Sequence, residues 1–188
     1  MKIEPKTEKY IKKFYGAREF LHNEKRCCLW LLNATPKDLQ SMSKVIERIK
    51  NIKIIRLNSK KLATQKFTDY PTRFMEIRQP IIEYILVPSH SSENRRYILI
   101  GFENADVICG DANNMLPDAT LYHFGVLTSN VHMAFIRAVA GRLEMRYRYS
   151  KDIVYNNFPF SAPSSEQRER IERTTRAILD ARNFYLIL

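Results

Sequence analysis

Three segments of this sequence place arginine or lysine beside aromatic and turn residues. They are residues 71–78, with Pro71-Thr72-Arg73-Phe74 followed by Arg78, the loop from Ser91 to Arg96, and the run from Arg146 to Lys151. Guanidinium and ammonium groups neutralise phosphates, and an arginine on a loop can also hydrogen-bond to base edges in the major groove. These residue types therefore favour the binding of a polyanion over bond-making chemistry. For any single residue of the set, a solvated charged surface is the alternative.

The overall charge agrees with that chemistry. The 188 residues include 31 Lys and Arg against 20 Asp and Glu, which gives a formal net charge of +11 and a pI near 9.7. A protein this basic is drawn to nucleic acid or to an anionic membrane surface. No apolar stretch reaches the length of a membrane span, and the charged N-terminus lacks the apolar core of a secretion signal. We therefore expect a cytoplasmic protein with a nucleic-acid partner and no membrane partner.

One tetrad, Asn157-Phe158-Pro159-Phe160, suggests methyl transfer to an amino group. The motif for that reaction is Asn/Asp-Pro-Pro-Tyr/Phe, in which the first residue accepts hydrogen bonds from the target amine and the aromatic stacks on the flipped base. Here Phe158 stands where the motif has proline, and the glycines, at positions 16, 101, 110, 125 and 141, form no GxG pattern for a cofactor loop. We interpret the tetrad as a strand end whose aromatic residues pack under the terminal helix. A complete methyltransferase that uses residues 157–160 as a degenerate catalytic motif is the alternative.

Other catalytic or metal-binding arrangements are not apparent. The four histidines, His22, His90, His123 and His132, lack ligand spacing, and we interpret them as structural. The three cysteines, Cys27, Cys28 and Cys109, form neither a metal-ligand pattern nor a disulfide framework, so we expect reduced thiols. We therefore predict no catalytic residue, no metal and no cofactor in this chain.

The first half of the chain is predicted to contain one buried strand and three helical segments. The segment from Glu8 to Leu21 could be helical for a turn or two before Gly16, and Cys27 to Leu32 is short and apolar enough for a buried strand. Thr35-Pro36 is a helix start, with Thr35 as N-cap. A longer helix begins near Ser43. If that helix continues, Arg56, Lys60 and Lys61 form a basic stripe on it.

The second half is predicted to be richer in strands. Short apolar runs at Tyr84–Val87, Tyr97–Ile100 and Ala119–Phe124 favour strands, and Ser129 is a good N-cap for a helix that ends near Leu143. From Glu144 to Tyr149 the residues alternate, with Arg146 and Arg148 on the outward face of a strand. Ser164 and Gln167 form a capping box for the last helix. The fold class is therefore mixed α/β, with a central mixed sheet, flanking helices and a C-terminal helix.

Several motifs in order resemble the target-recognition region of the MmeI-like DNA methyltransferases, which are fused restriction–modification enzymes of bacteria. The resemblance covers nearly the whole chain and rests on the following segments: Lys13–Phe20, Cys28–Leu31, Phe74–Pro80, Tyr97–Phe102, Leu121–Phe160 and Ala177–Arg182. It implies a DNA target-recognition domain at residues 1–160 and a C-terminal helical segment at residues 161–188 that packs on it or links from it. It also implies a methyltransferase core in the same polypeptide, upstream, where S-adenosylmethionine would bind and adenine would be methylated.

The resemblance further implies sequence-specific recognition of duplex DNA by binding rather than catalysis. We expect phosphate contacts from Arg56, Lys60, Lys61 and Lys151, and base or groove contacts from Arg73, Arg78, Arg95 and Arg96. Arg146 and Arg148 complete the predicted DNA-binding set. The loop from Ser91 to Arg96 matches a Ser-Ser-Glu-x-Arg-like stretch of the family and is the first candidate for a DNA-facing element. An RNA-binding or structural module with general polyanion affinity is the alternative.

Overall fold

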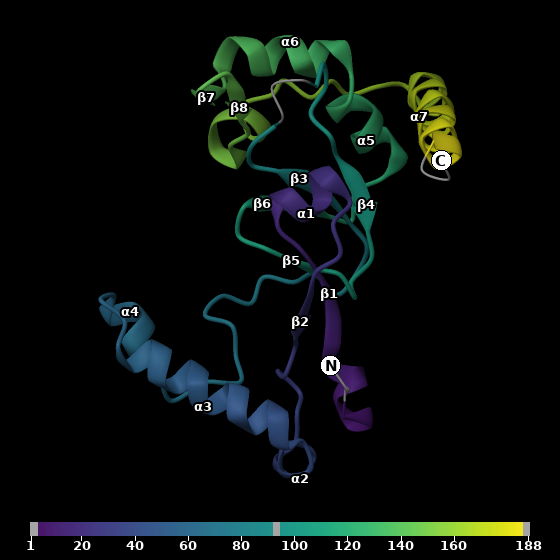
Figure 1. The fold of residues 1–188 in the computed structure, drawn as a ribbon. Coiled ribbons are helices and arrows are strands. Elements are labelled where there is room, and N and C mark those ends of the chain that lie inside the picture. The colour runs from purple at the N-terminus through teal and green to yellow at the C-terminus, as the bar shows by residue number, and fades with distance from the viewer. Residues whose placement is uncertain (1–3, 92–94, 186–188) are drawn as a thin grey trace. The chain divides into compact units, whose positions relative to one another are not determined.

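The computed structural model describes residues 4–91 and 95–185 of the chain (Figure 1). Helices and short strands are both present, which confirms the mixed α/β class. The strands gather in small sheets rather than in one central sheet. The chain forms two compact units, one from Met1–Phe14 and Arg26–Gln79, the other from Tyr15–Lys25 and Pro80–Leu188. Each unit thus combines segments that are distant in sequence.

The first unit begins with a 3-10 helix, η1 (Pro5–Tyr10), and the strand β1 (Ile11–Tyr15). The expected helical turns before Gly16 are therefore 3-10 turns that end earlier, and a strand follows them. The strand β2 (Cys27–Leu29) is shorter than the predicted one and runs antiparallel to β1, with Ile11 opposite Leu29. Three helices then follow: α2 (Pro36–Gln40), α3 (Ser43–Leu57) and α4 (Leu62–Gln65).

Local capping chemistry explains where these helices begin. The Thr35 side chain accepts a hydrogen bond from the Asp38 backbone N–H at 3.1 Å, as the sequence predicted for an N-cap. α3 starts at Ser43, also as predicted, but ends at Leu57. Lys61 has an extended backbone and forms the N-cap of α4, so the basic stripe predicted for a continued helix is not formed. A small core of Tyr10, Leu31, Met42 and Val45 lies in this unit.

The second unit is organised around a fully buried strand, β3 (Tyr84–Pro88), as predicted for Tyr84–Val87. β3 pairs antiparallel with β4 (Gly101–Glu103) on one side and with β6 (Asn113–Pro117) on the other. The helices and shorter strands of this unit are α1 (Ala17–His22), β5 (Ile108–Cys109), α5 (Leu121–Leu127), α6 (Asn130–Val139), β7 (Gly141–Leu143), β8 (Arg146–Arg148), the π-helix η2 (Lys151–Tyr155) and α7 (Ser165–Tyr185).

Two predicted strands are wrong. Residues 97–100 form no strand, although Ile98 and Ile100 are buried, because that segment packs its apolar side chains against the core without joining a ladder. The segment from Ala119 to Phe124 is not a strand either: α5 begins at Leu121, after Thr120 as N-cap. A short apolar run is compatible with a buried helix as well as a strand, and here tertiary packing decided for the helix.

The helix predicted from Ser129 is confirmed at its start and is shorter at its end. The Ser129 hydroxyl accepts from the His132 N–H at 3.1 Å, as an N-cap does. α6 ends at Val139, and the chain then turns into the antiparallel hairpin of β7 and β8, with Gly141 opposite Arg148. The capping box of α7 is confirmed, since the Ser164 N–H donates to Gln167 Oε1 at 2.9 Å and the Gln167 N–H donates to Ser164 Oγ at 3.3 Å.

A close contact between α5 and α7 depends on Gly125. A Cβ atom at this position would lie 2.2 Å from Thr175 Oγ1 and 2.8 Å from Ile171 Cγ2. The side chain of Thr175 is fully buried at this contact. Because any larger residue must displace α7, the glycine sets how closely the two helices approach.

Substitution Gly125→Ala should lower the free energy of unfolding by about 1–3 kcal/mol, because overpacking outweighs the better helix propensity of alanine. The matched control is Gly141→Ala, where a new Cβ would meet no atom within 4 Å. That control should change stability by less than about 0.5 kcal/mol. Chemical denaturation of both variants measures the difference, and equal stabilities would contradict the packing argument.

The core of the second unit also contains a histidine, His132. Its side chain is fully buried, its Nε2 lies 3.2 Å from the Tyr149 hydroxyl, and its ring meets that of Phe158 edge-on at a centroid distance of 4.5 Å. Burial lowers the pKa of His132 from its usual 6.5 to about 4. This histidine is therefore structural, as predicted, and stays neutral in the folded protein at neutral pH.

The burial of His132 predicts a loss of stability as the pH falls from about 6.5 to about 4. In this window the imidazole binds a proton in the unfolded chain but not in the folded one, so acid favours unfolding by an amount on the order of 3 kcal/mol. Denaturation at a series of pH values measures the slope. The variant His132→Gln keeps a polar group near Tyr149 but does not titrate, so it should lose less stability across the window. An unchanged slope in that variant would refute the assignment.

Candidate nucleic-acid interface

Four arginines converge on one groove in the second unit. The groove has a volume of about 540 Å³ and is lined by Arg95, Arg96, Arg137, Arg142, Met145 and Tyr147. We call it the arginine groove. All four arginines are exposed, and among the described residues no carboxylate forms an ion pair with any of them. The groove therefore offers several guanidinium groups to an anion from solvent.

Neighbouring aromatic rings and carbonyls orient some of these guanidinium groups. The guanidinium of Arg142 lies 4.4 Å from the centre of the Tyr147 ring, and its Nη1 donates to the Met145 carbonyl at 3.4 Å. Arg96 lies 5.5 Å from the centre of the Tyr97 ring, and Arg95 Nη2 donates to the Leu21 carbonyl at 3.0 Å. A guanidinium that stacks on a ring keeps its N–H donors directed outward, towards a ligand.

The β7–β8 hairpin that carries Arg142 is tied to the end of β3. The Tyr147 N–H donates to Ser91 Oγ at 3.2 Å, and the Tyr149 N–H donates to the Ser89 carbonyl at 2.8 Å. Both serines belong to the chain that leaves β3. The predicted DNA-facing loop from Ser91 to Arg96 is thus described at its two ends, while residues 92–94 lie outside the described residues.

The predicted residues Arg146, Arg148 and Lys151 lie on or just after the hairpin. Arg146 forms an ion pair with Glu144 in the hairpin turn and is partly buried, whereas Arg148 is exposed. Lys151 begins η2, and its Nζ lies 3.6 Å from Asp152 Oδ1, with both side chains largely exposed. An exposed ion pair of this kind contributes little to stability.

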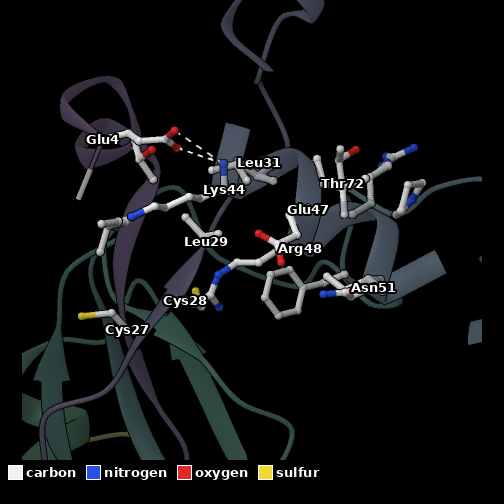
Figure 2. Close-up of a pocket in the computed structure, with 18 of the residues that line it drawn as sticks. Glu4, Cys27, Cys28, Leu29, Leu31, Lys44, Glu47, Arg48, Asn51 and Thr72 are labelled. Carbon is white, nitrogen blue, oxygen red and sulfur yellow. Dashed lines mark hydrogen bonds between the residues drawn. The ribbon is translucent and has the colours of Figure 1, made fainter. Parts of the chain in front are cut away.

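A second groove lies in the first unit, with a volume of about 890 Å³ (Figure 2). Cys27, Cys28 and Leu29 of β2 line one part, and residues of α3 from Lys44 to Ile52 line another. The two predicted residues Arg56 and Arg73 also line it. Because its walls are largely apolar and carry glutamates as well as basic groups, this groove is less suited to a phosphate than the arginine groove.

Arg56 has a structural role that the sequence did not reveal. Its Nη1 donates to the carbonyls of Phe67 and Tyr70 at 2.9 and 2.7 Å, and its Nη2 donates to the carbonyl of Arg73 at 2.7 Å. Partial burial lowers the pKa of this guanidinium from its usual value. An arginine side chain starts from so high a pKa that the group nevertheless stays charged at neutral pH. Arg56 therefore holds residues 67–73 against the end of α3.

The remaining predicted residues of the first unit are exposed. Lys60 and Lys61 lie in the connection from α3 to α4, and Arg73 is exposed where it lines the second groove. Arg78 forms an exposed ion pair with Glu76, with Nη2 and Oε2 2.6 Å apart. The structure thus distributes the ten predicted residues over both units and gathers only Arg95 and Arg96 in the arginine groove.

The tetrad at residues 157–160 has structural contacts. Asn157 Nδ2 donates to the carbonyls of Asp152 at 2.7 Å and Ile153 at 3.1 Å, at the end of η2. Phe158 is buried and packs on Phe135 of α6, with ring centroids 5.4 Å apart, as well as on His132. The tetrad therefore follows a π-helix rather than a strand, and its buried phenylalanine packs on α6 rather than under the terminal helix.

The residues present do not fit a cofactor loop for S-adenosylmethionine. Among the glycines, Gly16 alone stands between a strand and a helix, and its N–H donates to Glu19 Oε2 at 3.0 Å, so the protein's own carboxylate fills that position.

Burial raises the pKa of Cys28 to about 11 and that of Cys109 to about 12, which leaves both thiols protonated. Across residues 4–91 and 95–185, no cluster of three or more His, Cys, Asp or Glu could hold a metal ion. Within the same residues, no helix is long and apolar enough to cross a membrane.

Residues 1–162 match the family model described as "MmeI, target recognition domain". The chain belongs to this family. It is 39% identical over 178 residues to DNA methyltransferase A of Bacillus subtilis (strain 168), and this alignment covers 95% of this chain and 20% of that protein. It is 43% identical to the type IIL restriction-modification enzyme MmeI, solved in complex with DNA, with a TM-score of 0.93 over 97% of this chain and 24% of that one. The chain thus spans about a fifth to a quarter of these relatives, and the resemblance inferred from its motifs is confirmed.

Arg137 and Arg142 are the basic residues of the arginine groove that sequence reasoning missed. On one continuous helix from Ser129 to Leu143, two residues five positions apart point in different directions. α6 ends at Val139, however, and the chain reverses into β7, which brings the two side chains to the same groove. A prediction that the helix ends at Val139 would have been needed to place the two side chains together.

The bonds of Arg56 predict that Arg56→Ala lowers the free energy of unfolding by about 1–3 kcal/mol, because three carbonyls lose a charged donor. Hydrogen exchange at residues 67–73 should also accelerate. Arg56→Lys should not restore protection, since one compact ammonium cannot span the three acceptors. The control is Lys53→Ala, an exposed residue of the same helix, which should change stability by less than about 0.5 kcal/mol. Equal effects of the two alanine variants would contradict this role.

Proposed function

We propose that this chain binds duplex DNA in a sequence-specific manner and positions the target base for the catalytic part of a larger restriction–modification methyltransferase. The observation that carries the proposal is its membership of a target-recognition family, one member of which was solved in complex with DNA. The net charge of +11 and the arginine groove supply the electrostatic complement to a polyanion. The chain acts by binding, without a catalytic residue of its own.

The proposed roles of the basic residues follow from their exposure. Lys60, Lys61 and Lys151 are exposed and contact phosphates, where flexible ammonium groups suffice. Base or groove contacts come from the exposed arginines, in accord with the geometry by which guanidinium recognises guanine: Arg73, Arg78, Arg95, Arg96 and Arg148. Arg146 remains a proposed DNA contact, since its partner Glu144 is exposed like the partners of Arg78 and Lys151. Arg56 holds residues 67–73 in place, since its guanidinium donates to three carbonyls.

Under this proposal, the methyl-transfer reaction takes place in another part of the larger protein. The methyltransferase core of the same polypeptide binds S-adenosylmethionine and methylates adenine within a cytoplasmic enzyme. Residues 1–160 recognise DNA, and residues 161–188 form a helical segment that packs on them through the contact of α7 with α5. In support of this division, the family model ends at residue 162, just before α7.

Binding of the chain to duplex DNA should weaken steeply with salt. With six to eight phosphate contacts, the logarithm of the association constant should fall against the logarithm of the salt concentration with a slope of roughly −5 to −7. Fluorescence anisotropy with labelled duplexes over a series of NaCl concentrations measures this slope. A flat salt response would refute the proposal.

Two further measurements separate the alternatives. Selection from a pool of random duplexes should enrich one sequence, whereas a module with general polyanion affinity would enrich none and would bind structured RNA equally well. Calorimetry of the chain with S-adenosylmethionine should show no heat of binding. Measurable binding would support the complete methyltransferase that uses residues 157–160.

A further inference from the structure

The arginine groove contains two kinds of arginine. Arg95 and Arg96 end the loop from Ser91 to Arg96, the first candidate for a DNA-facing element, and base or groove contacts are predicted for both. Arg137 lies in the last turn of α6 and Arg142 in β7, so both are mounted on regular secondary structure. Side chains on rigid elements are suited to fixing the register of a duplex, while side chains on a loop are suited to reading it.

The surroundings of Arg137 and Arg142 favour an anion. The four guanidinium groups repel one another across the groove, and no described lining residue is acidic. Glu144, the acidic residue of the hairpin turn, is already paired with Arg146. The negative charge of a phosphate would offset this repulsion. In addition, each of two guanidinium groups can donate two parallel hydrogen bonds to the phosphate oxygens.

The geometry of Arg142 is prepared for such a ligand. Its guanidinium stacks 4.4 Å from the centre of the Tyr147 ring and donates weakly to the Tyr147 hydroxyl and the Met145 carbonyl, both at 3.4 Å. Bonds of this length hold the side chain in place and are easily exchanged for stronger ones. Nearby, the Tyr97 hydroxyl donates to Asn130 Oδ1 at 2.8 Å, which ties the segment after Arg96 to the start of α6. The two pairs of arginines are thus held on one framework.

We propose that Arg137 and Arg142 bind a backbone phosphate of duplex DNA and thereby set the register in which Arg95 and Arg96 meet the bases. This inference rests on the proposed function and adds two residues and a separate role to it. It requires that the pair act without regard to base sequence, because a phosphate carries no sequence information.

The test compares two double variants of the 188-residue chain. The first, Arg137→Gln with Arg142→Gln, removes the proposed phosphate contacts. The control, Arg173→Gln with Arg176→Gln, removes the same charge from two exposed positions of α7 in the same unit. Thermal melts of both variants establish that they are folded. Anisotropy titrations then use the duplex selected for the native chain and a duplex of unrelated sequence, over a range of salt.

The Arg137/Arg142 variant should bind both duplexes roughly 10- to 100-fold more weakly, and its salt slope should be shallower by about 1–2. The control should lose less than about 3-fold with an unchanged slope. Native-like binding by the first variant overturns the inference and leaves the proposed function intact. A loss confined to the selected duplex also overturns it, since that result would make the pair base readers. Failure of the native chain to bind any duplex overturns the proposed function and the inference together.

Discussion

The second unit depends on the burial of β3. This strand is hydrogen-bonded on both sides and all of its residues are buried, so it has no edge and no solvent face. The Tyr84 hydroxyl donates to the Val107 carbonyl at 2.7 Å, which satisfies the one polar side chain at its start. A slip of one residue would exchange the faces on which its apolar side chains pack, and both neighbouring strands oppose it. The chain leaving β3 then fixes the hairpin through Ser89 and Ser91, so the position of the arginine groove follows from the register of this strand.

The arginines of this protein fall into two groups, those that hold the fold together and those that are exposed to a ligand, and their contacts distinguish the two groups. Arg56 donates to three carbonyls, and Arg182 donates to the Ile100 carbonyl at 2.8 Å while stacking 5.2 Å from the centre of the Phe124 ring. Both therefore hold parts of the fold together. The four arginines that line the arginine groove are more exposed than these two. Arg95 donates to one carbonyl at 3.0 Å, and the two bonds of Arg142 are long, at 3.4 Å. A count of basic residues reports affinity for a polyanion, but only the contacts separate structural arginines from those available to a ligand.

Local chemistry could be predicted from the sequence, and long-range convergence could not. Thr35, Ser129 and Ser164 cap helices as predicted, because an N-cap depends on side chains within a few residues. The strand predicted from Ala119 is a helix, because a short apolar run does not distinguish the two when both are buried. The family could be inferred from ordered motifs along the whole chain. The sequence does not predict that Arg137 and Arg142 share a groove, because their proximity depends on where α6 ends. It does not predict the structural bonds of Arg56 either, because the acceptors are backbone carbonyls, which no residue type identifies.

The arginine groove has a consequence for the folding equilibrium of the free protein. Like charges held close together raise the energy of the folded state, whereas in the unfolded chain they can separate. An anion that binds only the folded form stabilises it in proportion to the logarithm of its concentration relative to its dissociation constant. An anion held in the groove would therefore raise the melting temperature of the domain, so that this temperature reports occupancy. Nucleic acid bound there would likewise slow unfolding and proteolysis.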